Sequence, residues 1–138
     1  MKVLCVDYGT KRVGLAISDD TGAMAFPLET ISSTHAIENI CHIIREKKVT
    51  QLVVGLPVHM DGREGNKSKE AREFGKQLER TTGLIPEYVD ETLSTYEAEQ
   101  ELKERKMSPK KRKQVIDQVA AQKVLQEFLD HKKRPSQK

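Results

Sequence analysis

The sequence has little of what several protein classes require. Among its 138 residues there are two cysteines, no tryptophan and only 4% aromatic residues. Cys5 and Cys41 are too few for a disulfide framework and lack the paired spacing of a zinc site, so both are expected to be buried thiols. No stretch approaches the about 20 apolar residues of a membrane crossing, and the start shows no apolar leader. These absences predict a cytoplasmic protein with no membrane partner.

The composition that is present fits one folded domain. Hydrophobic residues make up 36% and charged residues 33% of a chain whose length is typical of a single hydrophobic core. We expect that domain over residues 1–131, followed by a basic, disordered tail over 132–138. The net charge of +3 is compatible with a polyanionic partner but does not select one. The pattern leaves both a monomer and a homodimer open.

The spacing of apolar residues predicts the element order βββ-α-β-α-β-α-α. Strands are expected over residues 2–6, 13–18, 26–31, 51–56 and 86–90. Helices are expected over 34–48, from a cap at Asn66 to a stop at Gly83, from a capping box at Ser94 to about Met107, and from Ser108 through Phe128. The opening strands should be antiparallel, and helical crossovers should make the later ones parallel. The fold class is therefore α/β, a five-stranded mixed sheet with helices on both faces.

Three acidic residues occupy positions where they could meet. Asp7 ends the first strand and Glu91 follows the last, and right-handed crossovers bring parallel strand ends to one edge of a sheet. Asp117 shares the inward stripe of the final helix with Ala121 and Val124, where an acid needs a partner. Converging carboxylates repel one another in a low dielectric, so cations must neutralise them, and oxygen ligands suit Mg²⁺ or Mn²⁺. The three acids are thus candidate metal ligands and catalytic residues.

A cluster of this kind predicts phosphodiester hydrolysis. Two cations about 4 Å apart can activate a water and stabilise the leaving oxygen. Each acid also has a simpler explanation when taken singly. Asp7 could terminate a strand, Glu91 could favour the dipole of the following helix, and Asp117 could pair with a lysine.

Two basic segments are candidates for substrate binding. They are the first hairpin turn, with Gly9, Thr10, Lys11 and Arg12, and the junction of the last two helices, with Lys110, Lys111 and Arg112. Their cations could neutralise phosphates, although either segment could be no more than a solvated surface. Tyr8 is the best candidate for base stacking, and a place in the core competes evenly with that role. Because aromatic residues are scarce, structured RNA or branched DNA is a better substrate candidate than a single strand.

Four ordered motifs resemble the YqgF family, also called RuvX-like, over nearly the whole chain. They are VDYGTKRVGLAISD at 6–19, GLPVHMDG at 55–62, VDET at 89–92 and IDQVAAQKVLQEFL at 116–129. The resemblance implies a ribonuclease H-like fold, with Asp7, Glu91 and Asp117 at the positions of the family's acidic ligands. It also implies a nuclease acting in 5′-end maturation of pre-16S rRNA, with ribosomal precursor particles as partners. Thr92 stands where the family usually has arginine, which removes a group able to bind phosphate bidentately.

Other functions compete with that hypothesis. The family was first named for Holliday-junction resolution, so a resolvase-like DNA endonuclease is one alternative. The departure at Thr92 motivates a second, a non-catalytic nucleic-acid-binding module. The turn sequence Asp-Tyr-Gly-Thr also resembles the phosphate-binding turn of actin-like and sugar-kinase ATPases, but those proteins need two domains and a second phosphate loop. His59 is a conceivable proton-transfer group, and we leave it outside the catalytic set.

Overall fold

A computed structural model describes residues 1–57, 63–91 and 94–133 of the chain. The elements are β1 (Val3–Tyr8), β2 (Arg12–Ser18), β3 (Ala25–Ser32), α1 (Ala36–Lys47), β4 (Gln51–Leu56), α2 (Asn66–Thr82), β5 (Glu87–Asp90), α3 (Ser94–Glu104) and α4 (Pro109–Lys133). Their order confirms the prediction from apolar spacing. Across this part of the chain, no helix is both long and apolar enough to span a membrane.

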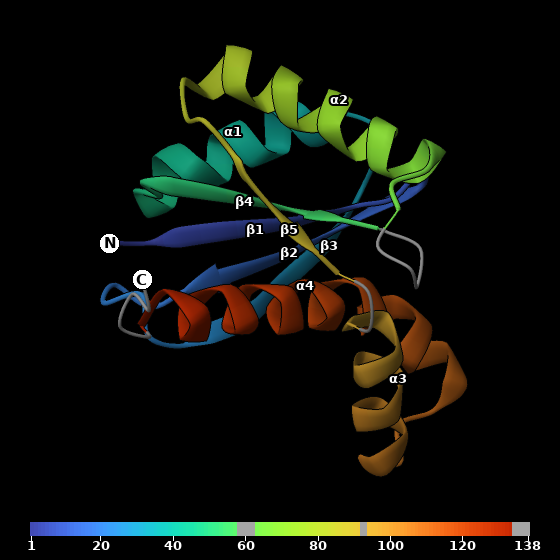
Figure 1. The fold of residues 1–138 in the computed structure, drawn as a ribbon. Coiled ribbons are helices and arrows are strands. Elements are labelled where there is room, and N and C mark those ends of the chain that lie inside the picture. The colour runs from blue at the N-terminus through green and yellow to red at the C-terminus, as the bar shows by residue number, and fades with distance from the viewer. Residues whose placement is uncertain (58–62, 92–93, 134–138) are drawn as a thin grey trace.

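The strands form one mixed sheet in the order β3-β2-β1-β4-β5. β1 and β3 both pair with β2 in antiparallel fashion, whereas β1 with β4 and β4 with β5 are parallel. Helices α1 and α2 cover one face of the sheet and α4 covers the other (Figure 1). Because β1, β4 and β5 run in the same direction, their carboxyl ends lie at one edge of the sheet.

The alternation of side chains along β1 decides which layer each residue faces. Leu4 and Val6 belong to the core between the sheet and helices α1 and α2. Val3 and Cys5 belong to the core between the sheet and α4. Successive side chains point to opposite faces of a strand, so Asp7 falls on the α4 side.

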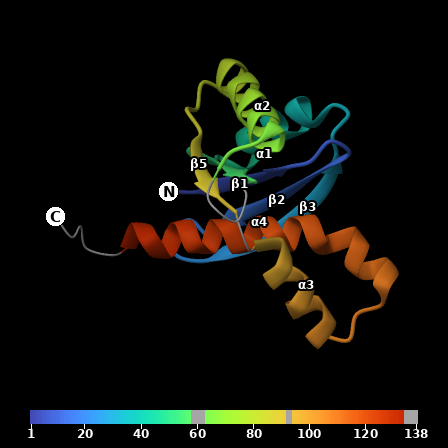
Figure 2. The same ribbon diagram turned by 45° about the vertical axis from the view of Figure 1, so that its right-hand side comes forward.

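Helix α3 packs against α4 rather than against the sheet. Ala98 and Leu102 of α3 form a small buried cluster with Val119 and Ala120 of α4. Helix α3, the turn after it and the start of α4 extend away from the sheet (Figures 1 and 2). We call residues 94–113, α3 with the first turn of α4, the α3–α4 arm.

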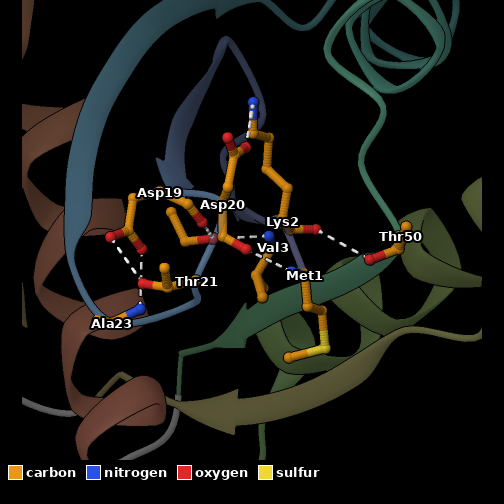
Figure 3. A network of polar contacts seen from close by, with 9 residues as sticks. Met1, Lys2, Val3, Asp19, Asp20, Thr21, Ala23 and Thr50 are labelled. Carbon is orange, nitrogen blue, oxygen red and sulfur yellow. Dashed lines mark hydrogen bonds and ion pairs between the residues drawn. The ribbon is translucent and has the colours of Figure 1, made fainter.

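Polar contacts fix the amino end of β1, at the far end of that strand from Asp7 (Figure 3). The amino group of Met1 donates to the carbonyl oxygen of Asp20, and the Lys2 ammonium lies 3.1 Å from the Asp20 carboxylate. The Asp19 carboxylate accepts bonds from the Ala23 amide at 2.8 Å and the Thr21 hydroxyl at 2.9 Å, which lower the pKa of Asp19. These bonds close the connection between β2 and β3.

Most helix ends fall where the capping residues predict them. Gly83 ends α2 in the left-handed conformation at a φ of 79°. Ser108 caps α4, because its hydroxyl accepts a bond from the Lys111 amide at 3.3 Å. The predicted cap at Asn66 is wrong: Gly65 is the N-cap, and its carbonyl already accepts a bond from the Lys69 amide at 3.2 Å. Helix α3 begins at Ser94 as expected, although the side chain that would form the capping box lies outside the described residues.

Two smaller expectations also need correction. Helix α4 continues to Lys133, beyond the predicted start of a disordered tail. The Lys132 ammonium lies over the Phe128 ring and donates to the Gln51 side chain at 3.1 Å, which ties the last turn of α4 to β4. Residues 134–138 of that tail lie outside the described part of the chain. Cys5 is buried as predicted, but Cys41 is only half-buried.

Candidate active site

Asp7 lies in a gap in the side-chain layer on the α4 face of the sheet. Its partners in the neighbouring strands are Gly14 of β2 and Gly55 of β4, and residues paired across strands present their side chains to the same face. A Cβ at position 55 would lie 2.5 Å from Oε2 of Glu91. A Cβ at position 14 would overlap the backbone of Asp117. The row Gly14–Asp7–Gly55 therefore leaves space on both sides of Asp7 for the other two acids.

Glu91 reaches Asp7 from the end of β5. Its amide donates to the Leu56 carbonyl at 3.0 Å, which continues the pairing of β4 and β5 by one residue. Val89, two residues earlier, packs in the core on the α4 side of the sheet. The same alternation directs Glu91 toward that face, where its carboxyl group forms a hydrogen bond with the carboxyl group of Asp7.

Burial raises the pKa of both acids. Desolvation and the charge of Asp7 raise the pKa of Glu91 to about 9. Desolvation also raises the pKa of Asp7 to about 6, a shift limited by the hydrogen bond from Glu91 and increased by the nearby charge of Asp117. Without a cation at neutral pH, the protonated Glu91 therefore donates to the ionised Asp7. Burial and both carboxyl groups raise the pKa of the adjacent Cys5 thiol as well.

Asp117 approaches the same place from α4 on the sheet-facing stripe that its spacing predicts. Its Oδ2 accepts a bond from Nε of Arg12, the first residue of β2, at 2.7 Å. An ion pair is one of the simpler explanations for this acid, but the partner is the predicted phosphate contact Arg12 rather than a lysine. Arg12 and Asp117 therefore act on each other within the site.

The three acids line one cavity of about 410 Å³ at the carboxyl edge of the parallel strands. The lining residues are Asp7, Tyr8, Gly9, Thr10, Lys11, Arg12, Pro57, Lys67, Glu70, Glu91 and Asp117. We call this cavity the acidic pocket. The predicted contacts of the first hairpin turn, Gly9 to Arg12, thus line the same pocket as the predicted catalytic acids.

Helix α2 supplies two lining residues that the sequence did not indicate, Lys67 and Glu70. They reach the acidic pocket because the buried Ser68 hydroxyl donates to the Pro57 carbonyl, which holds the start of α2 against the end of β4. Lys67 and Glu70 are three residues apart, one turn of the helix, so they project from the same side of α2. No motif or apolar pattern could have found them, because both are exposed polar residues on a helix.

The second basic segment does not enter the acidic pocket. Lys110, Lys111 and Arg112 lie at the start of α4, in the α3–α4 arm. Arg112 lines a separate groove between the two helices with Glu99, Leu102, Lys103, Lys113 and Ile116. The substrate contacts predicted from the sequence thus divide between a pocket and an arm.

The donor chemistry of the acidic pocket suits a hard cation. Asp7 and Glu91 are carboxylates forced into contact in a poorly solvated place, and a cation bound by oxygen ligands would relieve their repulsion. Within residues 1–57, 63–91 and 94–133, no three His, Cys, Asp or Glu side chains are grouped closely enough to hold a metal ion. In this arrangement Asp117 is bonded to Arg12, so a cation that took all three acids would have to compete with the guanidinium.

Three further residues stand out in the sequence. The Tyr8 ring packs on Phe74 with ring centroids 4.6 Å apart, which supports its core role, although Tyr8 also lines the acidic pocket. Thr92 and His59 lie outside the described residues.

Comparisons with known proteins match the chain over nearly its whole length. The family model described as "RuvX: Holliday junction resolvase" matches residues 1–131, which confirms the resemblance carried by the four motifs. A Leuconostoc mesenteroides protein named "Putative pre-16S rRNA nuclease" is 40% identical over 138 residues and covers 96% of either chain. A Maridesulfovibrio salexigens protein of the same name is 42% identical over 132 residues, with 94% of this chain and 98% of the relative covered.

Solved structures confirm the ribonuclease H-like fold. RuvC of T. thermophilus, solved in complex with Holliday junction substrate, matches with a TM-score of 0.59 at 14% identity, covering 96% of this chain and 95% of that one. A second T. thermophilus RuvC structure matches with a TM-score of 0.56 at 12% identity, with 96% of each chain covered. At this level of identity the likeness concerns the fold alone.

Proposed function

The chain belongs to the RuvX family, and from this membership and its acidic pocket we propose that it is a metal-dependent nuclease that hydrolyses phosphodiester bonds in structured nucleic acid. One observation carries the catalytic assignment. Asp7, Glu91 and Asp117 come from three separate segments of the chain and line the same pocket. Carboxylates brought together in this way are costly for folding unless a cation uses them.

The acidic side chains of the pocket, the cation that they bind and the basic side chains have different roles in hydrolysis. Asp7, Glu91 and Asp117 would hold Mg²⁺ or Mn²⁺, which when bound activates a water and stabilises charge on the leaving oxygen. Glu91 gives up its proton as the cation binds, because metal ligands are deprotonated. Lys11, at the rim of the same pocket, neutralises a phosphate next to the scissile one and so fixes the register of the substrate.

The two halves of the binding surface have different tasks in this proposal. Gly9, Thr10, Lys11 and Arg12 contact the phosphates at the point of cleavage. Lys110, Lys111 and Arg112 of the α3–α4 arm bind the backbone farther along the substrate. The arm is suited to this task because residues 103–113 carry seven lysines and arginines and only one acid, Glu104.

The substrate we propose is the 5′ region of pre-16S rRNA, within ribosomal precursor particles in the cytoplasm. The names of the relatives from Leuconostoc mesenteroides and Maridesulfovibrio salexigens support this choice. The family description supports a second candidate, the four-way DNA junction. A pocket that binds phosphates is compatible with either substrate, because both carry the same phosphodiester linkage.

A side-by-side cleavage assay tests the proposal. The protein is incubated with precursor 16S rRNA and with a four-way DNA junction, each with Mg²⁺, with Mn²⁺ and with EDTA. We expect cation-dependent cleavage of the RNA, and cleavage of the junction alone would favour the second candidate.

The same assay tests the three acids. Asp7→Asn, Glu91→Gln and Asp117→Asn each keep the side-chain volume and remove a ligand charge, so each should abolish cleavage while the protein stays folded. Lys76→Gln, an exposed change on α2 outside the acidic pocket, is the control and should retain activity. Full activity in all three acid variants would refute the assignment, as would binding of the nucleic acid with no cleavage by the unaltered protein.

A further inference from the structure

The contact between Arg12 and Asp117 joins a predicted substrate contact to a predicted metal ligand. Nε of Arg12 donates to Oδ2 of Asp117 at 2.7 Å, across 105 positions of sequence. The two residues meet because β2 and α4 approach closely at Gly14, which lies two residues after Arg12 on the same strand. The contact is therefore set by the packing of a helix on the sheet.

We propose that Arg12 is an exchangeable partner of Asp117. In the free protein the Arg12 guanidinium is bonded to the Asp117 carboxylate. When nucleic acid binds, the guanidinium moves to a substrate phosphate and leaves Asp117 available to a cation. This inference rests on the proposed function, since it assumes that the acidic pocket takes both a cation and a phosphate. Arg12 is then a positioning residue. It couples cation binding to nucleic-acid binding, because it can bond either to Asp117 or to a substrate phosphate but not fully to both.

The exposure of the pair favours exchange over a permanent bond. The side chain of Arg12 is 45% exposed and that of Asp117 is 27% exposed. Ion pairs this open to water are weak, because water and salt screen them. Among the described residues the Arg12 guanidinium makes this single hydrogen bond, so most of its donors are available to a phosphate. A phosphate can accept two parallel bonds from the guanidinium fork, which a contact through Nε alone does not provide.

Competition has a direct thermodynamic consequence. A cation and Arg12 cannot both neutralise Asp117 fully, so the guanidinium weakens cation binding to the free protein. A phosphate that draws Arg12 away removes this competition, and by linkage the cation must then strengthen binding of the phosphate by the same factor. The pocket would thus load its cation together with the substrate rather than before it.

The first test is calorimetric titration of the pocket with Mn²⁺ alone, without nucleic acid. Arg12→Gln should bind Mn²⁺ several-fold more tightly than the unaltered protein, because Asp117 has lost its competitor. Lys11→Gln is the matched control: it removes the same charge from the same pocket, but the Lys11 side chain makes no contact with Asp117 among the interactions of the described residues. We expect Lys11→Gln to show only the smaller gain that comes from losing a nearby positive charge.

The second test uses no cation. Binding of a blunt duplex RNA is measured in EDTA for Asp117→Asn, Arg12→Gln and the double variant. Asp117→Asn should tighten RNA binding by releasing Arg12, and this gain should shrink when Arg12→Gln is already present. Glu70→Gln, which removes an acid from another wall of the pocket, should give the same gain in both backgrounds.

The outcomes separate this inference from the function on which it rests. If the unaltered protein binds Mn²⁺ and Asp7→Asn abolishes that binding, but Arg12→Gln and Lys11→Gln behave alike, the exchange is wrong and the nuclease proposal stands. If the effects of Asp117→Asn and Arg12→Gln on RNA binding in EDTA are additive in the double variant, the conclusion is the same. If Mn²⁺ binds neither the unaltered protein nor Arg12→Gln, both proposals fail. Thermal unfolding of each variant shows whether a loss of binding is a loss of folding.

Discussion

Asp7 and Glu91 hold a single proton between them at neutral pH, since the pKa of Glu91 lies near 9 and that of Asp7 near 6. Both values are raised mainly by desolvation, because the acids lie between a sheet and a helix. Without a cation, loss of this shared proton would leave two charged carboxylates in contact and lower the stability of the fold. The pair therefore links the pH, the cation and the stability of the fold.

The first prediction concerns stability against pH in excess EDTA. A glutamate in the unfolded chain loses its proton near the ordinary pKa of 4.5, whereas folded Glu91 keeps its proton until the pH reaches about 9. Between these values the folded state binds more protons, so the free energy of unfolding falls as the pH rises through that window. Glu91→Gln is neutral at every pH and can still donate to Asp7, so its stability should fall less between pH 6 and 9. Urea unfolding at several pH values measures this, and parallel curves for the two proteins would contradict it.

The two glycines beside Asp7 should respond differently to alanine. At Gly55 the added Cβ lies closest to Oε2, at the end of the flexible Glu91 side chain, which can move aside. Gly55→Ala should therefore stay folded and lose cleavage activity, because the Glu91 carboxylate is pushed away from Asp7. At Gly14 the Cβ meets the backbone of Asp117, so α4 must lift from β2. Gly14→Ala should cost on the order of 1–3 kcal/mol of stability, as overpacked sites do.

Thermal unfolding and cleavage assays on the two variants provide the comparison. Equal destabilisation of both variants would mean that Gly14 and Gly55 do not differ in whether backbone or a flexible side chain fills the space beside them. Wild-type activity in Gly55→Ala would mean that the position of Glu91 is unimportant for the reaction.

Helix α4 packs against the sheet along its later part, and its first turn belongs to the α3–α4 arm. Asp117 marks the change, since Ala121 and Val124 after it are buried against the sheet while Lys113 and Lys110 before it are exposed. Lys113 and Lys110 lie four and seven residues before Asp117, on the same side of the helix and about 6 and 10 Å along its axis. A nucleic-acid backbone leaving the acidic pocket could therefore follow this side of α4.

This placement predicts a change in the salt dependence of binding. Each phosphate contact contributes about 0.9 to the slope of log affinity against log salt concentration on duplex DNA. Lys110→Gln combined with Lys113→Gln should lower the slope by about 2, with little effect on folding. Lys47→Gln combined with Lys76→Gln removes the same charge from helices α1 and α2 and should change the slope much less. Binding in EDTA at several salt concentrations measures both slopes. Equal slopes for the two double variants would contradict a nucleic-acid backbone that follows this side of α4.

The elements can be predicted where local chemistry decides them. Gly83 ends α2 because glycine tolerates the left-handed conformation, and Ser108 with Pro109 starts α4, both visible in the sequence. The cap of α2 cannot be placed in this way, because Asn66 and Gly65 are both acceptable caps by residue type. The end of α4 cannot be placed locally either, because Lys132 is held by Gln51, a residue far away in the sequence.

The acidic pocket can be predicted only in part for a similar reason. The strand ends and the helix stripe indicate that Asp7, Glu91 and Asp117 converge, and all three do line one cavity. Gly14 and Gly55 carry a usable signal as well, since a glycine inside a strand often marks a close approach of other backbone. Nothing local indicates that Arg12 chooses Asp117, or that α2 brings Lys67 to the rim, because these contacts depend on how separate layers pack.

At the scale of the whole molecule, the central claim is that the sheet, the end of β5 and helix α4 together build a place for cations. The direct measurement is a crystal structure of the protein grown or soaked with Mn²⁺, using anomalous scattering to locate the metal. The claim predicts Mn²⁺ among the carboxylates of Asp7, Glu91 and Asp117, and no such signal in crystals of Asp7→Asn. A pocket without Mn²⁺ at saturating concentration, in a protein that still cleaves nucleic acid, would contradict it.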